Sequence, residues 1–346
     1  MRGGPPGGSG GHGTPHSRDP RPKATKPRGA PPTRALARQP WAYRTVTSGQ
    51  RCASTVADTL GELTGLRRSR GSVVHRSLDE LLGSETPDVI FHTAVSRFKA
   101  AFTQLEPMAR AGINVVSSCE ELVFPQLREA SLARRLDRLC RKHGARIVGT
   151  GVNPGFVMDL LPVCLTGVSR EVSGVHIQRV VDASTRREPL QRKIGSGMPP
   201  RRFRQLLKQG KAGHAGLKES LALVAYCLGW KVKTISESAE AVIADHDIET
   251  KYLKVRKGET CGLHQRAEAR MGGKVAISLD LRMYLDAPNP HDAIQIESQP
   301  PVSLVMPGGV AGDDATVAAL VNTAPRLMDA EPGVVLITDL KVPRVG

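Results

Sequence analysis

The stretch INVVSSCEELVFPQLREASLARRLDRLCRKHGARIVGTG, residues 113–151, decides the fold. Its first six residues form a short apolar run that is typical of a buried strand. Residues 124–144 carry apolar side chains at helical spacing and end in Gly144, which predicts a helix closed by glycine. ARIVGTG then predicts the next strand. A strand, a helix and a strand joined by short turns indicate a parallel α/β unit.

The preceding residues extend the same pattern toward the N-terminus. DVIFHT, residues 88–93, predicts a buried strand, and residues 97–112 predict an amphipathic helix that ends at Gly112. SLDELLGS, residues 77–84, predicts a short helix with Ser77 as its cap. Strands and helices therefore alternate from residue 77 to residue 151, and a parallel sheet is expected.

Beyond residue 151 the pattern changes to long strand-like runs with a few helices. Residues 157–168, 199–211 and 217–230 predict helices, and residues 174–184 predict a long strand. TKYLKVRK, KVAISLDLRMYLDA and PPVSLVMP predict further strands between residues 231 and 307. A mixed or antiparallel sheet is expected here. Residues 307–330 then predict a glycine turn and a closing helix capped by Asp313 or Asp314.

The net charge of +16 is concentrated in the N-terminal segment. Residues 1–56 hold ten Arg or Lys against one acid, Asp19, so the rest of the chain is only mildly basic. Residues 1–40 are rich in Gly, Pro and Arg and cannot bury enough apolar surface to offset chain entropy, which predicts disorder. A transit peptide is the alternative, but the many prolines oppose an amphipathic helix.

The cysteines and the apolar runs bear on the compartment. Six cysteines are scattered without a CxxC pair, and no secretory leader is visible, so free thiols in a reducing cytoplasm are expected. The longest apolar runs fall far below the ~20 residues of a membrane span. Cys261 and His264 lack a second pair of ligands, so no metal site is predicted.

Three strand ends converge in a parallel sheet of this kind, and ligands bind outside such ends. Glu120 follows the strand of residues 113–118 directly and is a candidate proton carrier, with a structural role equally open. Glu121 is interpreted first as a residue that caps or opens the next helix. The other candidates around the three ends are His92, Thr93, Ala94, Ser118, Cys119, Asn153, Pro154 and Gly155. For Asn153 a bond to its own backbone is the competing interpretation, and for His92 and Cys119 a packing role.

A second polar cluster lies in RVVDASTRREPLQRKIGSGM, residues 179–198. Five polar side chains fall within twelve residues, in a connection from a strand to a helix. They are Asp182, Arg186, Arg187, Gln191 and Lys193. Such density favours a substrate or phosphate site about as much as a solvated surface.

Four of these segments together resemble a known family. SSCEELVFPQL, GTGVNPGFVMD, RVVDASTRREPLQRK and PGGVAGDDATVAALVN are similar, in this order, to the 2,4-diaminopentanoate dehydrogenase group, relatives of dihydrodipicolinate reductase. The resemblance runs from about residue 57 to residue 343. It implies a Rossmann-like parallel sheet in residues 57–152, completed by a helix at about 313–343, and an α+β substrate and dimerisation domain in residues 153–312.

The resemblance also implies chemistry. The expected activity is NAD- or NADP-dependent oxidative deamination of a small amine, or the reverse reductive amination of a ketone, often in a homodimer. The nicotinamide would lie near residues 153–156, in a site formed with the other cofactor-binding candidates. Glu120 matches the family's proton-handling glutamate, and Asp182, Arg186, Arg187, Gln191 and Lys193 would bind the substrate.

The expected glycine-rich loop is missing from the sequence. A dinucleotide-binding sheet begins with a strand, GxGxxG and a helix, whereas the glycines of residues 3–13 stand in a Pro-rich segment. Residues 1–56 have about the length of the family's opening but the wrong composition. We hypothesise that they are a shifted reading frame of GC-rich DNA, which would leave the chain without its pyrophosphate site and inactive.

Three alternatives stay open beside the amine dehydrogenase. A dihydrodipicolinate reductase-like imine reductase is one, although the histidine pair and lysine used by that family have no evident match. A degenerate, non-catalytic paralogue that binds a ligand or partner is another. Nucleic-acid binding through the Arg-rich segment ranks last, because only Trp41 and Tyr43 offer stacking.

Overall fold

The computed structural model describes His75, residues 77–84 and residues 86–345. The chain divides into two units, residues 1–43 and 44–346, and every described residue belongs to the second. The predictions of disorder and of a frame shift in residues 1–56 lie outside the described residues. The account below concerns the second unit alone.

Four parallel strands form the first sheet, in the order β1, β2, β3, β12. Their bounds are β1 (Val89–His92), β2 (Asn114–Ser117), β3 (Arg146–Gly149) and β12 (Gly333–Val335). Neighbouring residues of β2 are buried on opposite faces: Val115 joins one apolar cluster and Val116 another. Burial on both faces explains why two adjacent residues of this strand, Val115 and Val116, are both apolar.

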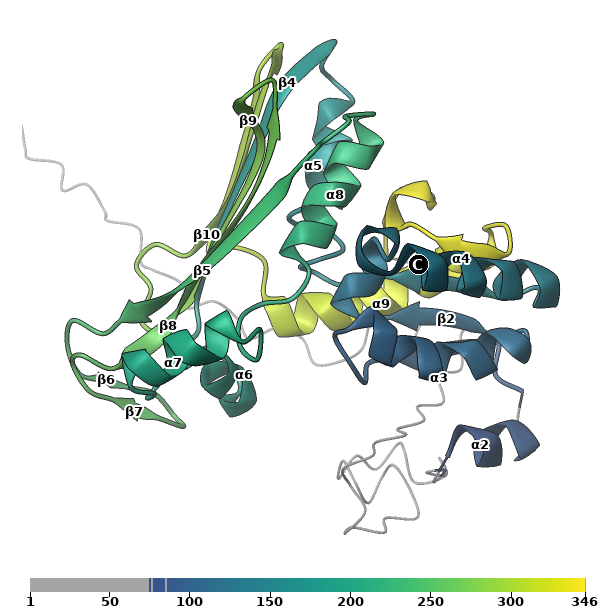
Figure 1. Ribbon diagram of the computed structural model, residues 1–346, viewed down its shortest axis with the longest axis horizontal. Coiled ribbons are helices and arrows are strands. Elements are labelled where there is room, and N and C mark those ends of the chain that lie inside the picture. The colour runs from purple at the N-terminus through teal and green to yellow at the C-terminus, as the bar shows by residue number, and fades with distance from the viewer. Residues whose placement is uncertain (1–74, 76, 85, 346) are drawn as a thin grey trace, which may run out of the picture. The chain divides into compact units, whose positions relative to one another are not determined.

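Helices cover both faces of this sheet (Figure 1). α3 (Phe98–Arg110) and α4 (Gln126–His143) pack on the side of Val115, and α9 (Gly312–Met328) packs on the side of Val116. α4 ends at Gly144, which is left-handed with φ 77°, as the sequence predicts. The short helix α2 (Leu78–Ser84) has the predicted cap, since the Glu80 backbone N–H donates to Ser77 Oγ at 3.1 Å.

Six strands form the second sheet, in the order β11, β10, β4, β9, β8, β5. Their bounds are β4 (Glu171–Asp182), β5 (Ile235–Ile243), β8 (Thr260–Met271), β9 (Lys274–Tyr284), β10 (His291–Gln299) and β11 (Val302–Pro307). β4 and β9 are parallel and the other neighbours antiparallel, so the sheet is mixed. The predicted fold class, a Rossmann-like parallel sheet plus an α+β part with a mixed sheet, is confirmed.

The second sheet buries one face and presents polar side chains on the other. Leu279 and Leu281 of β9 pack under helices, whereas Asp280 between them bonds His264 at 3.0 Å. The helices of this part are α5 (Leu160–Thr166), α6 (Glu188–Lys193), α7 (Pro200–Lys208) and α8 (Leu217–Cys227). Figure 1 shows α5 and α8 beside the sheet.

One local prediction is wrong and another holds only in part. Neither Asp313 nor Asp314 caps α9: its N-cap is Ala311, and Asp313 instead pairs with Arg186. The predicted strand TKYLKVRK is confirmed only at Lys254–Val255 (β7), which pairs with Ile248–Glu249 (β6) in a small hairpin. Two short 3-10 helices complete the described elements: η3 (Glu120–Val123) and η4 (Ile337–Asp339). The domain boundaries at residues 152 and 312 stay predictions.

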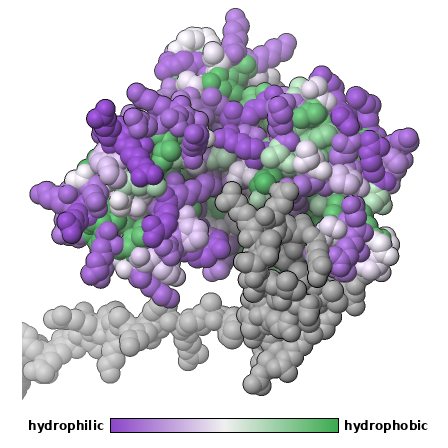
Figure 2. All heavy atoms as spheres, turned by 60° about the horizontal axis from the view of Figure 1, so that its bottom comes forward, coloured by the Kyte–Doolittle hydropathy of each residue, from purple (hydrophilic) through white to green (hydrophobic). Residues whose placement is uncertain are grey.

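The surface of the described residues is largely polar. Hydrophilic side chains dominate the coloured face in Figure 2, and the exposed large apolar residues, such as Val168 and Val305, are scattered along the chain. Among the described helices none is both long and apolar enough to cross a membrane.

Candidate functional site

The carboxyl ends of the first three strands lie side by side. His92, Ser117 and Gly149 occupy matching positions on β1, β2 and β3. The chain stays tied together just beyond them, since Ser118 N–H donates to the His92 carbonyl at 2.9 Å and Thr150 N–H donates to the Ser117 carbonyl at 2.8 Å. The three strand ends that were predicted from the sequence to converge therefore lie at one edge of the sheet.

Glu120 stands at the start of η3, directly after β2. η3 rests on the end of β3, where a Cβ on Gly149 would lie 2.5 Å from the Leu122 backbone, so glycine is required there. Glu120 is half-buried, and among the described residues no group donates a hydrogen bond to its carboxylate. A carboxylate with free lone pairs in a partly dry place is suited to taking up a proton.

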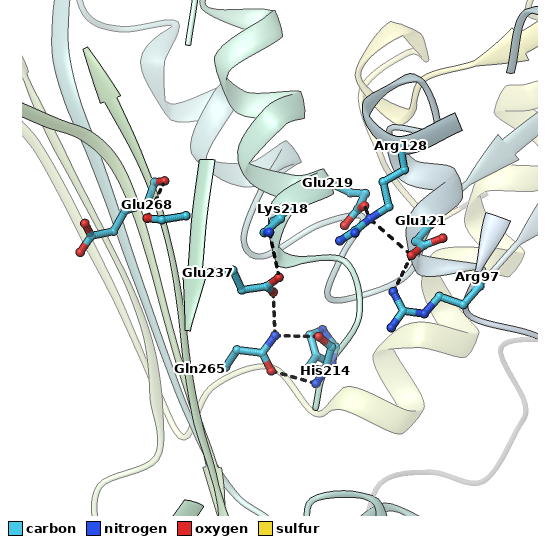
Figure 3. Close-up of polar contacts among 10 residues, drawn as sticks. Arg97, Glu121, Arg128, His214, Lys218, Glu219, Glu237, Gln265 and Glu268 are labelled. Atoms are coloured by element: carbon cyan, nitrogen blue, oxygen red, sulfur yellow. Dashed lines mark hydrogen bonds and ion pairs between the residues drawn. The ribbon is translucent and has the colours of Figure 1, made fainter. Parts of the chain in front are cut away.

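Glu121 has a structural role, but at the start of the preceding helix, α3, and not at the next helix, which the sequence interpretation had it cap or open. Its buried carboxylate accepts the backbone N–H of Phe98 at 2.9 Å, at the start of α3, and the guanidinium of Arg97 at 2.6 Å. Arg128 of α4 lies 3.4 Å from the same carboxylate and also binds Glu219 of α8 (Figure 3). One guanidinium therefore joins η3 to α8.

The carboxylate of Asp159 fixes the turn of residues 151–156 by a hydrogen bond to its backbone, and the sequence did not single out this residue. Asp159 is fully buried; it accepts Gly155 N–H at 2.8 Å, Ser220 Oγ–H at 2.6 Å and Leu160 N–H at 2.6 Å. Burial raises the pKa of this carboxyl, against the effect of its three donors. Its position just before an apolar helix was the available signal, because Asp is a preferred N-cap.

Asn153 is the one member of that turn with free polar atoms. Its side-chain nitrogen and oxygen are both buried, and neither has a partner among the described residues. The side chain does not bond its own backbone, which was the competing interpretation. Buried amide groups without partners are rare in folded proteins, and such an exception calls for a ligand or water. A donor and an acceptor side by side complement a primary carboxamide.

The other candidates at the strand ends differ in exposure. His92 is buried and uses both ring nitrogens, bonding Ser117 and Gln104 at 2.8 Å each, and burial lowers its pKa. Cys119 is buried, and burial raises the pKa of its thiol to about 12. Ser118 is half-buried, while Thr93 and Ala94 are exposed at the end of β1. The thiol of Cys119 thus stays protonated at neutral pH.

The structure divides the second polar cluster into separate groups. Arg186 pairs with Asp313 at 2.9 Å and Arg187 with the same carboxylate at 3.3 Å, at the start of α9. Asp182 accepts the backbone N–H groups of Ser184 and Asp286.

Gln191 and Lys193 behave differently from these residues. Gln191 is fully buried, donates to the carbonyls of Ser184 and Arg186, and accepts from Thr250. Lys193 is exposed, and its charge acts on His214. Of the five predicted substrate-binding side chains, Lys193 is the one whose charge lowers the pKa of His214.

A loop that the sequence reasoning did not single out completes the neighbourhood. Residues 209–216 connect α7 to α8, and Gly213 and Gly216 adopt φ values of 104° and 101° that favour glycine. A Cβ on Gly216 would lie 2.6 Å from Pro154 Cγ and 3.0 Å from Glu120 Cβ. This contact brings the loop, the turn of residues 151–156 and Glu120 together.

A pocket of about 590 Å³ opens beside this loop. Side chains of both charges line it: Arg97, Arg128 and Arg204 are cationic, and Glu237 and Glu240 are anionic. Glu237 is tethered by Gln265 at 2.8 Å and lies 3.7 Å from Lys218 (Figure 3). The volume suits a small molecule, and the mixed charge suits one that carries both a carboxylate and an ammonium group. Among the described residues no cluster of His, Cys, Asp and Glu could hold a metal ion.

Comparison with known proteins gives consistent results over most of the chain. A family model described as the 2,4-diaminopentanoate dehydrogenase C-terminal domain matches residues 156–345. The chain is 30% identical over 284 residues to 2,4-diaminopentanoate dehydrogenase of Acetoanaerobium sticklandii, with 80% of each chain covered. It is 22% identical over 311 residues to an amine dehydrogenase of Streptomyces virginiae, covering 78% of this chain and 85% of that one.

A solved structure shares the fold. The amine dehydrogenase from Mycobacterium smegmatis superimposes with a TM-score of 0.75 at 23% sequence identity, covering 85% of this chain and 88% of that chain. The match covers the residues of both sheets, so the two proteins share a fold with one parallel and one mixed sheet.

Proposed function

Because the chain belongs to the 2,4-diaminopentanoate dehydrogenase family, we propose that it is an NAD(P)-dependent oxidoreductase acting on a small amine or diamino acid, such as 2,4-diaminopentanoate. The reaction is oxidative deamination or the reverse reductive amination. The observation that carries the proposal is the meeting of Glu120, with its unpartnered carboxylate, and the free amide of Asn153 beside a pocket of mixed charge.

Asn153 is the observation that fits the nicotinamide half of the cofactor. Its unpartnered donor and acceptor match a carboxamide, and the turn around it lies at the carboxyl edge of the parallel sheet. When bound, NAD(P) supplies the acceptor for the hydride that leaves the amine carbon. His92, Thr93, Ala94, Ser118, Cys119, Pro154 and Gly155 are proposed to line the same edge. A loop for the pyrophosphate is not among the described residues.

Glu120 is the proposed proton carrier. An ammonium group must lose a proton before its nitrogen lone pair can form a C=N bond, and the carboxylate of Glu120 has free lone pairs for that proton. In the reverse direction the same carboxyl returns the proton. Glu121, fixed by Phe98 N–H and Arg97, only anchors η3 and so holds Glu120 at the sheet edge.

The pocket beside residues 209–216 is the proposed place for the rest of the substrate. Arg97 and Arg204 would attract a carboxylate, and Glu237 or Glu240 would attract a second ammonium group. Lys193 is the member of the predicted substrate cluster whose charge reaches this region. We also propose a homodimer in the cytoplasm, which sedimentation and cell fractionation would test.

An assay with amine substrates tests the proposal. The chain is incubated with NAD⁺ or NADP⁺ and 2,4-diaminopentanoate or simple amines, and reduced cofactor is followed by its absorbance. Replacing Glu120 by Gln should lower kcat by about 10²–10⁴-fold, the usual contribution of a general acid or base. Glu331, which is exposed and distant in sequence from the site, gives the matched control Glu331→Gln.

The outcomes separate the candidate functions. Turnover that survives Glu120→Gln unchanged would remove Glu120 from the chemistry. Binding of the diamine without binding of NAD(P)H would favour the non-catalytic paralogue, and reduction of a cyclic imine instead of amine oxidation would favour the dihydrodipicolinate reductase-like alternative.

A further inference from the structure

His214 is held in place by its backbone and not by its ring. Gln265 of β8, which is buried, accepts the His214 backbone N–H at 2.9 Å and donates to the His214 carbonyl at 2.8 Å. Figure 3 shows this two-point contact, with Glu237 bonded to the same Gln265 side chain. The imidazole is therefore not needed to fix the loop of residues 209–216.

One nitrogen of the imidazole, Nε2, is buried and has no hydrogen-bond partner among the described residues. The backbone of Asn153 favours the protonated ring, which is the effect of a carbonyl group facing an N–H of the ring. We therefore assign the proton of the neutral ring to Nδ1, which leaves Nε2 as the acceptor. Nε2 therefore carries a lone pair that faces no donor.

The ring also stays neutral. Burial, and then the charges of Lys193 and Arg179, lower the pKa of His214 to about 3. A neutral ring with Nδ1 protonated accepts a hydrogen bond at Nε2 and does not take up a proton at neutral pH.

We propose that His214 contacts the substrate, its Nε2 accepting a hydrogen bond from an N–H of the reacting amine. The inference rests on the proposed function, because it assigns this contact within the same amine site. Gly216, two residues along the loop, lies against both Pro154 and Glu120, so the loop that carries His214 borders the proton carrier. Glu120 takes the proton, and His214 orients the nitrogen that loses it.

A purely structural histidine looks different in this same protein. His92 is buried at the end of β1 and uses both ring nitrogens, on Ser117 and Gln104. His264 pairs with Asp280 on the polar face of the second sheet. His214 is half-buried in the lining of the pocket, and its Nε2 atom is buried without a partner among the described residues. A structural role without a ligand does not explain this, since a buried polar atom without a partner is destabilising.

The test is an NMR titration of the full chain labelled with ¹⁵N-histidine. Addition of 2,4-diaminopentanoate should move the His214 Nε2 resonance toward that of a hydrogen-bonded nitrogen, while pentanoate, which has no N–H, should leave it in place. The ring should stay neutral throughout. An Nε2 resonance that does not respond to the diamine overturns the inference, and this experiment needs no variant that must fold.

Calorimetry with variants gives an independent measurement. His214→Phe should weaken binding of 2,4-diaminopentanoate about 10-fold, the effect of one hydrogen bond, and His214→Gln should recover most of it. His176→Phe, on the polar face of the second sheet, is the matched control and should bind as the unaltered chain does. Equal binding by His214→Phe overturns the inference.

The failure of the contact and the failure of the proposed function give different results. Amine oxidation at unaltered kcat and KM by His214→Phe removes the contact and leaves the function. A response of Nε2 to the diamine, without any NAD(P)-dependent oxidation by a chain that binds NAD(P)H, supports the contact and removes the function.

Discussion

Two histidines show how the same residue can take different roles. His92 is buried and bonds both ring nitrogens within the sheet, whereas His214 is half-buried and its Nε2 has no partner among the described residues. Burial lowers the pKa of both rings, so neither gains a proton easily in the folded chain. Both rings should therefore make the protein less stable in acid, because the unfolded chain binds the protons that the folded chain refuses.

The acid sensitivity due to His214 can be isolated. Its pKa is about 3 when folded, against 6.5 for a free ring. Between these values the unfolded state binds one more proton, so the free energy of unfolding should fall by up to about 1.4 kcal/mol per pH unit as pH drops below 6.5. His214→Gln should lose that part of the slope. Urea unfolding at several pH values between 7 and 4 measures it, with His176→Gln as control; parallel slopes for the two variants would contradict the assignment.

A methyl group at Gly216 should disturb the site. The added Cβ would meet Pro154 and Glu120 at φ 101°, so Gly216→Ala should lower the free energy of unfolding by roughly 1–3 kcal/mol and reduce kcat. Gly210→Ala is the matched control, because Gly210 also has positive φ but an added Cβ would have nothing within 4 Å. Thermal unfolding and turnover of both variants decide the matter; equal losses would mean that backbone strain alone acts.

Predictability at the residue scale depended on distance along the chain. Glu120 could be singled out because it directly follows a strand, a local pattern. His214 could not, because its environment is supplied by Gln265, 51 residues further on, and by Asn153. The polar cluster around Arg186 was dense in sequence, but packing sends its side chains in different directions, with Gln191 into the core and Arg186 to α9.

At the scale of elements, Arg128 links η3 to α8 through two buried carboxylates. Glu219 is fully buried, and one of its oxygens has no partner among the described residues. Glu121 is buried almost completely. Burial raises the pKa of the Glu219 carboxyl, and the charge of Arg128 acts in the opposite direction, so the guanidinium stabilises the ionised carboxylate there.

Removing the guanidinium should expose that dependence. Arg128→Met should lower the free energy of unfolding by about 2–4 kcal/mol, less than a fully buried pair because Arg128 itself is partly exposed. Adding Glu219→Gln should recover part of the loss. Arg134→Met, on the exposed side of α4, should change stability by less than about 0.5 kcal/mol. Chemical denaturation measures all three, and equal stability of Arg128→Met and Arg134→Met would refute the link.

Strands and helices could be predicted from local patterns where a strand is buried on both faces or where a helix has one apolar face. The strands and helices of residues 88–151 were predicted in order because each run is bounded by a turn or a glycine. The cap of α9 was not, because Asp313 is drawn away by Arg186 and Arg187 from a distant strand end. Propensity for a cap is a weak preference that two guanidinium groups override.

At the scale of the whole molecule, the prediction concerns the part of the chain that would bind the pyrophosphate of the cofactor. The sequence of residues 1–56 does not show the pattern of a strand followed by GxGxxG and a helix, and these residues lie outside the described part of the chain. Sequencing the coding DNA upstream of Val56 and translating its three frames tests the frame-shift hypothesis directly. A frame with strand, GxGxxG and helix is expected, and its absence in all three would sink the hypothesis.

A graft would show the functional effect. Replacing residues 1–56 by the strand, GxGxxG loop and helix of another family member should tighten NAD(P)H binding by at least ~100-fold, since each backbone donor to a phosphate contributes about 1.5–3 kcal/mol. Fluorescence titration of the two chains measures the difference, with His214 and Glu120 unaltered in both. Equally tight binding by the chain as written would show that the loop is dispensable.

The way α7 is attached has a consequence for how such enzymes diversify. Phe203 is its single fully buried side chain, seated against Gly195, while Arg204, Leu207 and Lys208 line the pocket. The part of the lining on α7 is thus held by one fully buried side chain and by partly buried Leu207, whereas Arg128, elsewhere in the lining, is bound to two buried carboxylates. Substitutions of the pocket-lining residues of α7 can therefore change the charge and shape of the pocket with little loss of stability. New substrate preferences should therefore arise in lineages through α7 before they arise anywhere near Arg128.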